Sequence, residues 1–385
     1  MKLLKIISRN TFRHWLRSGL TILGLAITVM AFIIIRTTID AWYAQAEAAS
    51  PNRLITRHAV SLTFFLPLAY EQKIREVEGV TDVSHASWFG AVYIEPQNFF
   101  AQFAVAPDNY LQMYPEFVID SSEMAAWRTE RNAAIVGVKL ADRFGWKIGD
   151  RVQLTGTIFP GDWDFVIRGM YTGAKENTDE NAFFFRWDYL DERLRKESPM
   201  RSGYVGTFAI EIDDPEQAAV ISERVDALFQ NSAYETKTET EEAFNLSFVA
   251  MASAIITGLK AISIMVIGVV MLVLGNTMAM TARERVSEYA VMKTIGFRPW
   301  HIVGLIFGES LFMAALGGAI GLAIALPIAH LVQIALSTFF PVFGIKIATL
   351  GYALLAAMIV GLLAAIFPTM KAVRTPIVDG LRIVD

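Results

Sequence analysis

The charged stretch NTMAMTARERVSEYAVMKTIGF, residues 276–297, separates two long apolar runs of the chain. Its cations are Arg283, Arg285 and Lys293. One apolar run covers residues 261–282 and ends inside this stretch, and the other covers residues 310–346 after it. About 20 helical residues are enough to cross the hydrocarbon core of a bilayer. Two membrane spans joined by a short charged segment are therefore predicted here.

Two further apolar runs, at residues 18–35 and 347–370, bring the number of predicted spans to four. The run at 310–346 is longer than one span needs, so we expect it to include a helix end and an outer loop. A proline in a membrane helix kinks it or lies close to its end. Because this run contains two prolines, the third span is expected to end near Leu336.

Charge sorts these segments by side. Residues 40–250 hold 33 acidic and 19 basic residues, whereas the rest of the chain holds 5 acidic and 15 basic residues. Basic residues concentrate in the loops that stay in the cytoplasm. Both termini are therefore expected in the cytoplasm, and residues 40–250 outside it. The predicted fold class is an α-helical membrane protein with four transmembrane helices and a large mixed α/β extracytoplasmic domain between helices one and two.

The first residues have an amphipathic pattern. Leu4, Ile7, Thr11 and Trp15 share one side of a helix. The other side carries cations, at Lys2, Lys5, Arg9, Arg13 and Arg17. This pattern predicts a helix on the inner membrane surface with its cations toward lipid headgroups; a basic topology signal without fixed structure is the alternative. The following apolar run exceeds the roughly 7 to 15 residues of a cleaved signal, so we expect it to remain as an anchor.

The outer region has the pattern of a mixed α/β domain with two subdomains. Alternating or β-branched runs between turn residues predict strands at 90–95, 99–105, 151–157, 163–170 and 208–212. Helices are predicted at 67–78 and 215–230. Residues 235–248 are expected to form a helix that continues into the second span without a break. The chain has no cysteine, so no disulfide holds this domain.

These signals divide the whole chain into consecutive segments. In order they are an amphipathic interface helix at 1–17, a first span at 18–39, the extracytoplasmic domain at 40–244, a stalk and second span at 245–282, a cytoplasmic coupling helix at 283–298, a third span at 300–336, an outer loop at 337–346, a fourth span at 347–370 and a cytoplasmic tail at 371–385.

The helix predicted after the second span has two stripes. One contains Val286, Ala290, Lys293 and Phe297, and the other contains Glu284, Glu288, Val291 and Ile295. Gly296 is suited to end this helix, and Pro299 to begin the next. Two stripes predict two contacts, one with the membrane or the chain's own bundle and one with a separate protein.

The same stretch carries a resemblance to a known family. It contains Asn-x-Met, Arg-x-x-Glu, a small residue, a basic residue and Ile-Gly, here Asn276, Met278, Arg285, Glu288, Ala290, Lys293, Ile295 and Gly296. Further similar blocks lie at 13–27, 134–154 and 368–382, and at Glu309. The chain resembles the permeases of macrolide-exporter and lipoprotein-release type ABC transporters, which include the FtsX proteins. Lys293 and Phe297 depart from the commoner arginine and alanine, which leaves the substrate open.

The resemblance implies a multi-pass permease of the bacterial cytoplasmic membrane. It implies a dimer with a second copy or a paralogue, bound to cytoplasmic ABC ATPases that hold ATP and Mg²⁺. No G-x-x-x-x-G-K-[ST] phosphate loop occurs within these 385 residues, so the chain is not expected to hydrolyse ATP. Membrane lipid, a periplasmic adaptor and an outer-membrane channel are further implied partners. The residues expected to couple to the ATPase are Arg283, Glu284, Arg285, Glu288, Ala290, Lys293 and Gly296.

Glu309 and Asn276 are polar residues within predicted spans. Because an unpaired carboxylate is costly in a bilayer, Glu309 is expected to bond a backbone amide or a cation at the inner face rather than to relay protons. The third span also carries small residues spaced four apart, at Gly304, Gly308, Gly317 and Gly321. This spacing predicts close packing against another helix, within the chain or across a dimer.

The sequence contains no pattern of an enzyme, metal or nucleic-acid site. Its five histidines are scattered, and neither H-E-x-x-H nor G-x-S-x-G occurs. Aromatic residues of the outer domain are expected mostly in its core, with an apolar substrate grip as the alternative. No metal, resident cofactor or nucleic-acid partner is predicted.

Three functions fit the resemblance. The first is ATP-driven export of a small amphiphile or peptide, in which inner ATPase dimerisation moves the outer domain by mechanotransmission. The second is extraction of a lipoprotein or lipid from the inner membrane. The third is mechanical regulation of a cell-wall hydrolase without transport.

Overall fold

The computed structural model describes residues 7, 9–175, 177–336, 340 and 342–378. The chain divides into two units. The membrane unit comprises Met1–Ala41, Ala252–Leu336 and Phe343–Asp385, and the outer unit comprises Trp42–Met251 and Ser337–Val342. Four helices are long and apolar enough to cross a membrane, and a mixed α/β domain lies between the first and second of them. The predicted fold class is confirmed.

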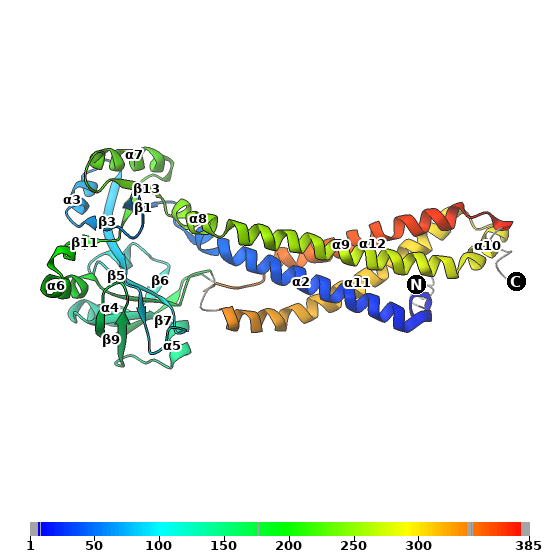
Figure 1. Cartoon of the computed structure of the whole chain (residues 1–385), viewed down its shortest axis with the longest axis horizontal. Helices are drawn as coiled ribbons and strands as arrows, with labels where there is room; N and C mark the ends of the chain where they lie inside the picture. Colours follow the sequence, from blue (N-terminus) through cyan, green and yellow to red (C-terminus); the bar gives the residue numbers. More distant parts are fainter. Residues whose placement is uncertain (1–6, 8, 176, 337–339, 341, 379–385) are drawn as a thin grey trace. The chain divides into compact units, whose positions relative to one another are not determined.

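The membrane unit contains four long helices that run side by side (Figure 1). They are α2 (Trp15–Ala48), α9 (Ser253–Glu284), α11 (Pro299–Leu336) and α12 (Ile347–Arg374), and α2 follows the short 3-10 helix η1 (Phe12–His14). Their apolar windows have a mean hydropathy between 2.2 and 2.4. The short helix α10 (Val286–Thr294) connects α9 to α11.

Each long helix contributes side chains to the centre of the bundle. Leu25 of α2, Leu274 of α9, Met313 of α11 and Val360 of α12 belong to one buried cluster. Because lipid tails are as apolar as these side chains, close packing and interhelical hydrogen bonds hold such a bundle together. The Ser310 hydroxyl accordingly donates to the Gly361 carbonyl at 2.6 Å, joining α11 to α12.

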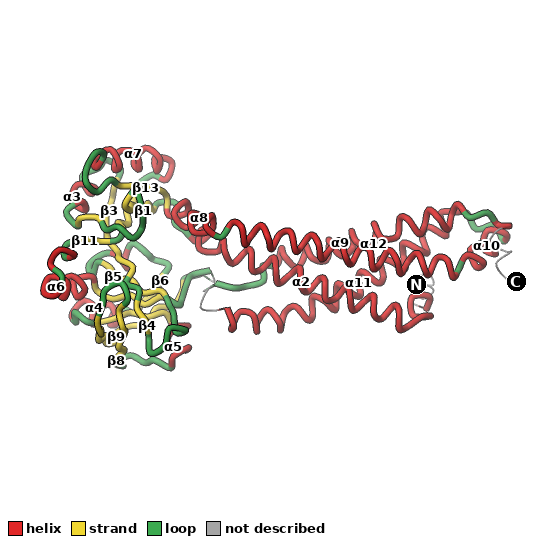
Figure 2. The backbone as a smooth tube through the Cα atoms, in the orientation of Figure 1, coloured by secondary structure: helices red, strands yellow, loops and turns green. Residues whose placement is uncertain are grey.

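The outer unit is built on an eleven-stranded mixed sheet, drawn in yellow in Figure 2. Ten strands follow the order β13-β1-β12-β3-β5-β10-β7-β9-β8-β4, and β6 pairs with β9. These strands are β1 (Arg53–His58), β3 (Val80–Trp88), β4 (Ala91–Val92), β5 (Ala101–Val105), β6 (Phe117–Ile119), β7 (Ala133–Gly137), β8 (Arg151–Gly156), β9 (Gly161–Gly173), β10 (Ala182–Arg186), β12 (Thr207–Ile212) and β13 (Thr236–Thr240). A separate pair joins β2 (Leu66–Pro67) to β11 (Tyr204–Val205).

Both faces of this sheet are buried. Successive side chains of a strand point to opposite faces, so Phe183 and Phe185 of β10 enter one core and Phe184 enters the other. The covering helices are α3 (Tyr70–Arg75), η2 (Tyr110–Gln112), α4 (Ser121–Thr129), α5 (Val138–Phe144), α6 (Trp187–Glu197), η3 (Pro199–Arg201), η4 (Pro215–Gln217), α7 (Ala218–Phe229) and α8 (Glu241–Met251). The core therefore uses most of the outer aromatics, as predicted.

The prediction of one unbroken helix from residue 235 into the second span is wrong. Thr236–Thr240 form β13, the helix α8 begins only at Glu241, and Ala252 separates α8 from α9. Alternating threonines favour a strand, and the Thr238 hydroxyl hydrogen-bonds that of Thr56 on β1 at 2.8 Å. Pairing with β1 thus overrides the helical pattern of this segment.

Candidate functional site

The charged helix α10 ends as the sequence predicts. Gly296 has a φ of +97°, a left-handed conformation that suits glycine. Its amide donates to the Lys293 carbonyl at 3.2 Å, and the Phe297 amide donates to the Met292 carbonyl at 3.0 Å. This pair of bonds is the Schellman arrangement, which satisfies carbonyls at a helix end. The chain can then begin α11 directly at Pro299.

A buried ion pair joins the start of α10 to α11. Arg285 Nη1 lies 3.1 Å from Glu309 Oε2, and these residues are 6% and 5% exposed. Arg285 Nε also lies 3.6 Å from Glu288 Oε2. The expectation that Glu309 binds a cation is confirmed. Beside this pair, burial raises the pKa of Tyr289 to about 12, so its hydroxyl stays neutral.

Lys293 joins α10 to the end of α12. Its Nζ donates to the carbonyls of Ala372, Val373 and Thr375 at 3.2, 3.0 and 2.8 Å. A cation at a helix C-terminus satisfies unpaired carbonyls and opposes the negative end of the helix dipole. Lys293 is therefore a structural contact of the bundle.

The two acidic residues near the α9–α10 junction bind basic residues that lie before and at the start of α2. Arg17 donates two bonds of 2.9 Å to the Glu284 carboxylate, and His14 Nε2 lies 3.5 Å from the same group. Arg13 pairs with Glu288. Arg13 and Arg17, which were expected to face lipid headgroups, thus pair with carboxylates of the chain itself, and a contact with lipid stays a prediction. Three positions of that predicted surface, Lys2, Leu4 and Lys5, lie outside the described residues.

The structure separates the predicted coupling residues into inward and outward sets. Ala290 is only 4% exposed, so it belongs to the inward set, and its expected coupling role stays a prediction. Of the predicted residues, Arg283, Glu284 and Gly296 stay exposed. Beside them lies an exposed apolar set, Val291, Ile295, Phe297 and Trp300, which we call the coupling surface. Trp300 was absent from the sequence prediction, although an indole directly after Pro299, beside the charged stretch, is a usable signal.

The spaced glycines have different environments. A Cβ at Gly317 would lie 2.5 Å from the Leu25 Cβ, and one at Gly321 would lie 2.6 Å from the Ala26 carbonyl, so both lie tightly against α2. Gly308 faces Ile7, whereas Gly304 has nothing within 4 Å. The predicted close packing is therefore made within the chain by Gly317 and Gly321. Asn276 is exposed on α9.

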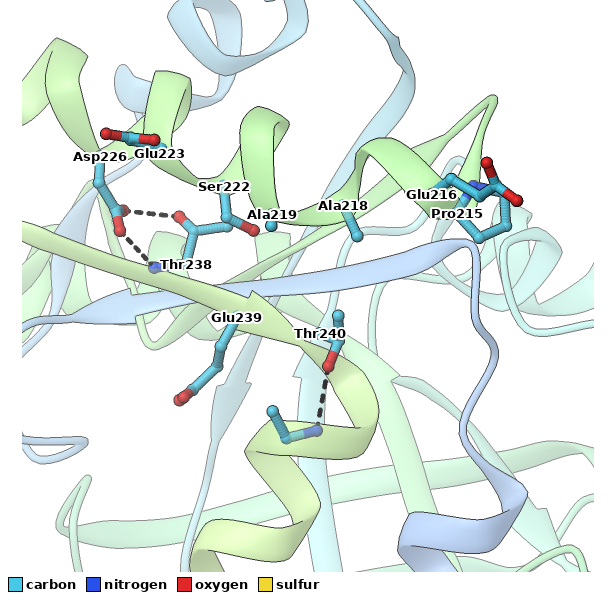
Figure 3. A pocket seen from close by; sticks show the side chains of 11 residues that line it. Pro215, Glu216, Ala218, Ala219, Ser222, Glu223, Asp226, Thr238, Glu239 and Thr240 are labelled. Atoms are coloured by element: carbon cyan, nitrogen blue, oxygen red, sulfur yellow. Dashed lines mark hydrogen bonds between the residues drawn. The ribbon is translucent and has the colours of Figure 1, made fainter.

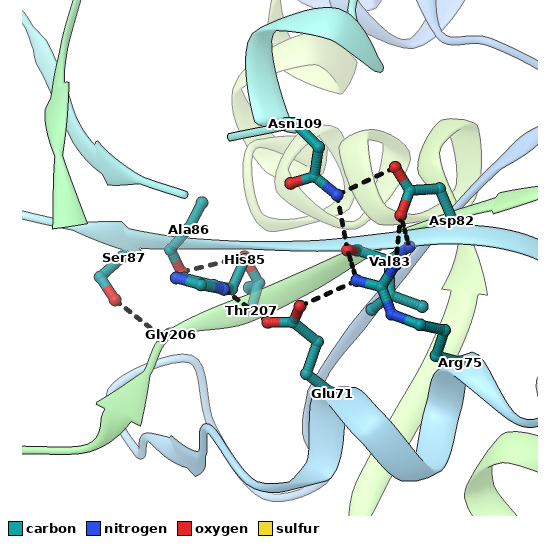
Figure 4. Close-up of polar contacts among 10 residues, drawn as sticks. All are labelled: Glu71, Arg75, Asp82, Val83, His85, Ala86, Ser87, Asn109, Gly206 and Thr207. Carbon is teal, nitrogen blue, oxygen red and sulfur yellow. Dashed lines mark hydrogen bonds and ion pairs between the residues drawn. The ribbon is translucent and has the colours of Figure 1, made fainter. Parts of the chain in front are cut away.

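A polar network of the outer unit fastens α3 to β3 (Figure 4). Glu71 Oε2 lies 2.7 Å from His85 Nδ1, and Arg75 donates to Glu71 at 3.0 Å and to Asp82 at 2.8 Å. Burial opposes ionisation of Glu71, but the bonds from His85 and Arg75 outweigh it and lower the pKa of this carboxyl. The network is an ion-pair cluster that stabilises the subdomain.

A groove of about 660 Å³ lies between α7 and β13 (Figure 3). Four carboxylates line it, from Glu216, Glu223, Asp226 and Glu239. Asp226 accepts bonds from the Thr238 amide and hydroxyl at 2.9 and 2.7 Å, and Glu239 pairs with Arg57 and Lys237. Two of the carboxylates thus hold the edge strand in place. Among the described residues, no group of acids and histidines is arranged to bind a metal.

The fold and this site define a class: a multi-pass membrane protein with an α/β domain after its first span and a charged helix between its second and third. Comparison with known families gives the particular family. Residues 18–228 match the MacB-like periplasmic core domain, and residues 260–377 match the FtsX-like permease C-terminal region. The chain belongs to the MacB/FtsX-type family of ABC transporter permeases.

Individual relatives agree with this family. The ABC transporter permease YvrN of Bacillus subtilis is 22% identical over 420 residues, which cover 98% of each chain. An ABC transporter permease of Methanocaldococcus jannaschii is 23% identical over 277 residues, covering 68% of this chain and 64% of its own. The matched regions span only 30% and 52% of two further permeases. The solved periplasmic region of MacB from Actinobacillus actinomycetemcomitans matches 52% of this chain and 94% of its own, at 6% identity and a TM-score of 0.37.

Proposed function

We propose that this permease is driven by a separate cytoplasmic ABC ATPase, whose ATP-dependent dimerisation moves the outer unit to export a small amphiphile or peptide. The observation that carries the proposal is the coupling surface, an exposed apolar set beside a charged helix between two spans. The missing phosphate loop supports a separate source of energy. Two permeases, as copies or paralogues, would bind two ATPases, with an adaptor and an outer-membrane channel beyond them.

The coupling surface has the composition of a protein contact. Its residues Val291, Ile295, Phe297 and Trp300 are 45%, 72%, 44% and 63% exposed. Burying one such side chain contributes roughly 1.5–3 kcal/mol, so together they suffice to anchor a partner. Val291 on α10 and Ile295, the residue that follows its last turn, are four positions apart, which is how a helix presents side chains to a groove.

The proposed orientation places the coupling surface in the cytoplasm of a bacterial inner membrane. The cations flanking the spans support it, because basic loops stay inside. Both termini are then cytoplasmic and the acidic outer unit is periplasmic. Exposed aromatic residues of the outer unit support an amphiphilic substrate: Trp88 and Phe99 are 39% and 44% exposed, with ring centroids 6.1 Å apart.

The test is co-purification of the ATPase with an affinity-tagged full-length chain. Replacing Val291 and Ile295 with Asp is expected to reduce the bound ATPase about tenfold or more, because two apolar contacts are lost. The control is Met200→Asp, which places the same charge on an outer residue that is 93% exposed. Equal recovery of ATPase from both variants would count against the proposal. Accumulation of amphiphiles, retained lipoproteins or a silent hydrolase in a deletion strain would then separate the three functions.

A further inference from the structure

Five residues before and at the start of α2 contact the helices α9, α10 and α11. They are Ile7, Phe12, Arg13, His14 and Arg17, which we call the N-terminal clasp. Its cations bind Glu284 and Glu288 through the ion pairs described above. Glu284 is the last residue of α9, and Glu288 lies in the first turn of α10. The clasp therefore binds both sides of the junction at which the chain turns into α10.

The apolar side of the clasp binds a third helix. The Phe12 ring meets the Phe312 ring of α11 edge-on, with centroids 6.5 Å apart. Ile7 lies over Gly308, where an added Cβ would come within 2.7 Å of Ile7 Cδ1. Between these residues Thr11 is 1% exposed, and its carbonyl accepts a bond from the Ser18 hydroxyl. The segment is thus packed into the bundle, and this packing fixes the position of the backbone that carries its cations.

The geometry at Arg17 restricts orientation as well as distance. Both of its terminal nitrogens donate to the two oxygens of Glu284, each at 2.9 Å. A bidentate arginine–carboxylate pair is directional, unlike a single contact. The side chains are 29% and 35% exposed, so the pair contributes little net stability and acts mainly on orientation.

We infer that the N-terminal clasp sets the orientation of the coupling surface and that Arg17 and Glu284 are positioning residues for ATPase coupling. The inference rests on the proposed function for what is coupled, but not for the contact itself. Without the clasp, α10 would still be held by Arg285 and Lys293, and the coupling surface would still be present. The coupling surface would lose its alignment with α2, the helix that continues past the unit boundary at Ala41.

The contact is tested first, in membrane vesicles without any partner. The chain contains no cysteine, so Phe12→Cys and Phe312→Cys form a clean pair for a short bismaleimide. Free thiols are then counted by mass-tagging. Arg17→Glu or Glu284→Arg is expected to slow the cross-link about tenfold, because each puts like charges face to face, and the double exchange is expected to restore it. Equal rates in all of these backgrounds would overturn the inference.

Arg9→Glu is the matched control for this experiment. Arg9 is an exposed cation of the same segment, and it has no partner among the described residues. Arg9→Glu changes the net charge of the segment by the same amount as Arg17→Glu, so it also reports any effect of that charge on membrane topology. Its cross-linking rate is expected to equal that of the parent pair. A tenfold loss in this control would assign the effect to general charge and overturn the role of Arg17.

The coupling role is tested second, on the full-length chain purified with its ATPase. Arg17→Glu and Glu284→Arg are expected to retain the ATPase within about twofold but to change its activity per bound subunit about fivefold or more, with recovery in the double exchange. A merely structural effect would instead follow the melting temperature. Unchanged activity in every variant would overturn the inference and leave the proposed function intact. If no ATPase accompanies the parent chain, the proposed function fails, while cross-linking still judges the clasp.

Discussion

Two buried charged residues of opposite sign lie where α10 meets the bundle, and each neutralises the charge of the other. Arg285 and Glu309 are almost fully buried and 3.1 Å apart. A charge in such a place is costly when it is alone and tolerated when it is paired. Arg285 Nη2 has no hydrogen-bond partner in the described part of the chain, so the pair is not fully satisfied. The ion pair is therefore better regarded as a fixed joint between two elements than as a source of large net stability.

Removing one member of this pair is expected to be worse than removing both. Glu309→Leu should lower the free energy of unfolding by about 3–5 kcal/mol, because it leaves Arg285 buried and unpaired. Glu309→Leu with Arg285→Met should cost clearly less, since no charge remains. Denaturant unfolding of the purified chain in detergent measures both variants. The single variant Arg285→Met completes the comparison. If the loss of unfolding free energy in the double variant equals the sum of the losses in the two single variants, the residues do not interact.

Glu71 in the outer unit gives a prediction about pH. Its pKa is below the ordinary value of 4.5 in the folded chain, so the ionised form stabilises the fold above that pH. This contribution is lost as the pH falls through the lower, folded-state value. Glu71→Gln should therefore lower the melting temperature at pH 7, and the difference from the parent chain should shrink toward pH 3. A difference between the two chains that stays constant from pH 7 to pH 3 would contradict this role of Glu71.

Among the elements, α10 depends on how its last turn is closed. Gly296 adopts its left-handed conformation without a Cβ clash, and any other residue pays roughly 1–2 kcal/mol there. Gly296→Ala is therefore expected to speed hydrogen exchange at the Phe297 amide about fivefold or more. Gly304→Ala in α11 is the control, because nothing lies within 4 Å of a Cβ added at that position. Similar exchange in both variants would refute the role of the glycine cap.

The contact between α2 and α11 depends on a missing side chain. An alanine Cβ at Gly321 would lie 2.6 Å from the Ala26 carbonyl, a backbone atom that moves only if the helices separate. Gly321→Ala should therefore destabilise the bundle by about 1–3 kcal/mol. Gly258→Ala, in a membrane helix with open space around the position, should change stability little. Thermal unfolding in the same detergent compares the two, and equal melting temperatures would contradict the close contact.

Considered as a whole, the chain crosses between its two units four times, and the crossings at residues 41–42 and 251–252 are of different kinds. Helix α2 continues without interruption from Trp15 to Ala48, past the unit boundary at Ala41. The return connection is interrupted at Ala252, between α8 and α9. Of these two crossings, the first therefore lies within a single helix and the second does not. In the proposed mechanism this makes α2 the stiffer route for movement between the coupling surface and the outer unit.

The proposed topology predicts opposite labelling of two exposed sites. Single cysteines at Met200 and Ile295 stand alone because the chain has no other, and the native residues are 93% and 72% exposed. In intact spheroplasts an impermeant maleimide should label Met200→Cys but not Ile295→Cys, and inverted vesicles should show the reverse. The reason is that the flanking cations hold α10 in the cytoplasm. Labelling of both sites from one side would exclude four spans with this orientation.

Local features of the chain were predictable, because they depend on a few neighbouring residues. A run of about 20 apolar residues crosses a bilayer whatever surrounds it, so composition alone indicates the four spans. Gly296 ends α10 for an equally local reason, the left-handed conformation that glycine accepts. The need of Glu309 for a cation follows from the cost of a lone charge in a membrane, although its identity as Arg285 does not.

Features that depend on residues far apart in the chain came only from the tertiary structure. The sequence predicts two stripes on this helix but not which of them faces the bundle; packing buries Ala290, and the fold brings Arg13 and Arg17 to Glu288 and Glu284. Residues 236–240 form a strand because β1 lies beside them. Membrane insertion and the ends of helices depend on neighbouring residues, so the sequence predicts them. Which way a side chain faces and which residues pair with each other depend on the surfaces that meet in the folded chain, and no local sequence pattern contains that information.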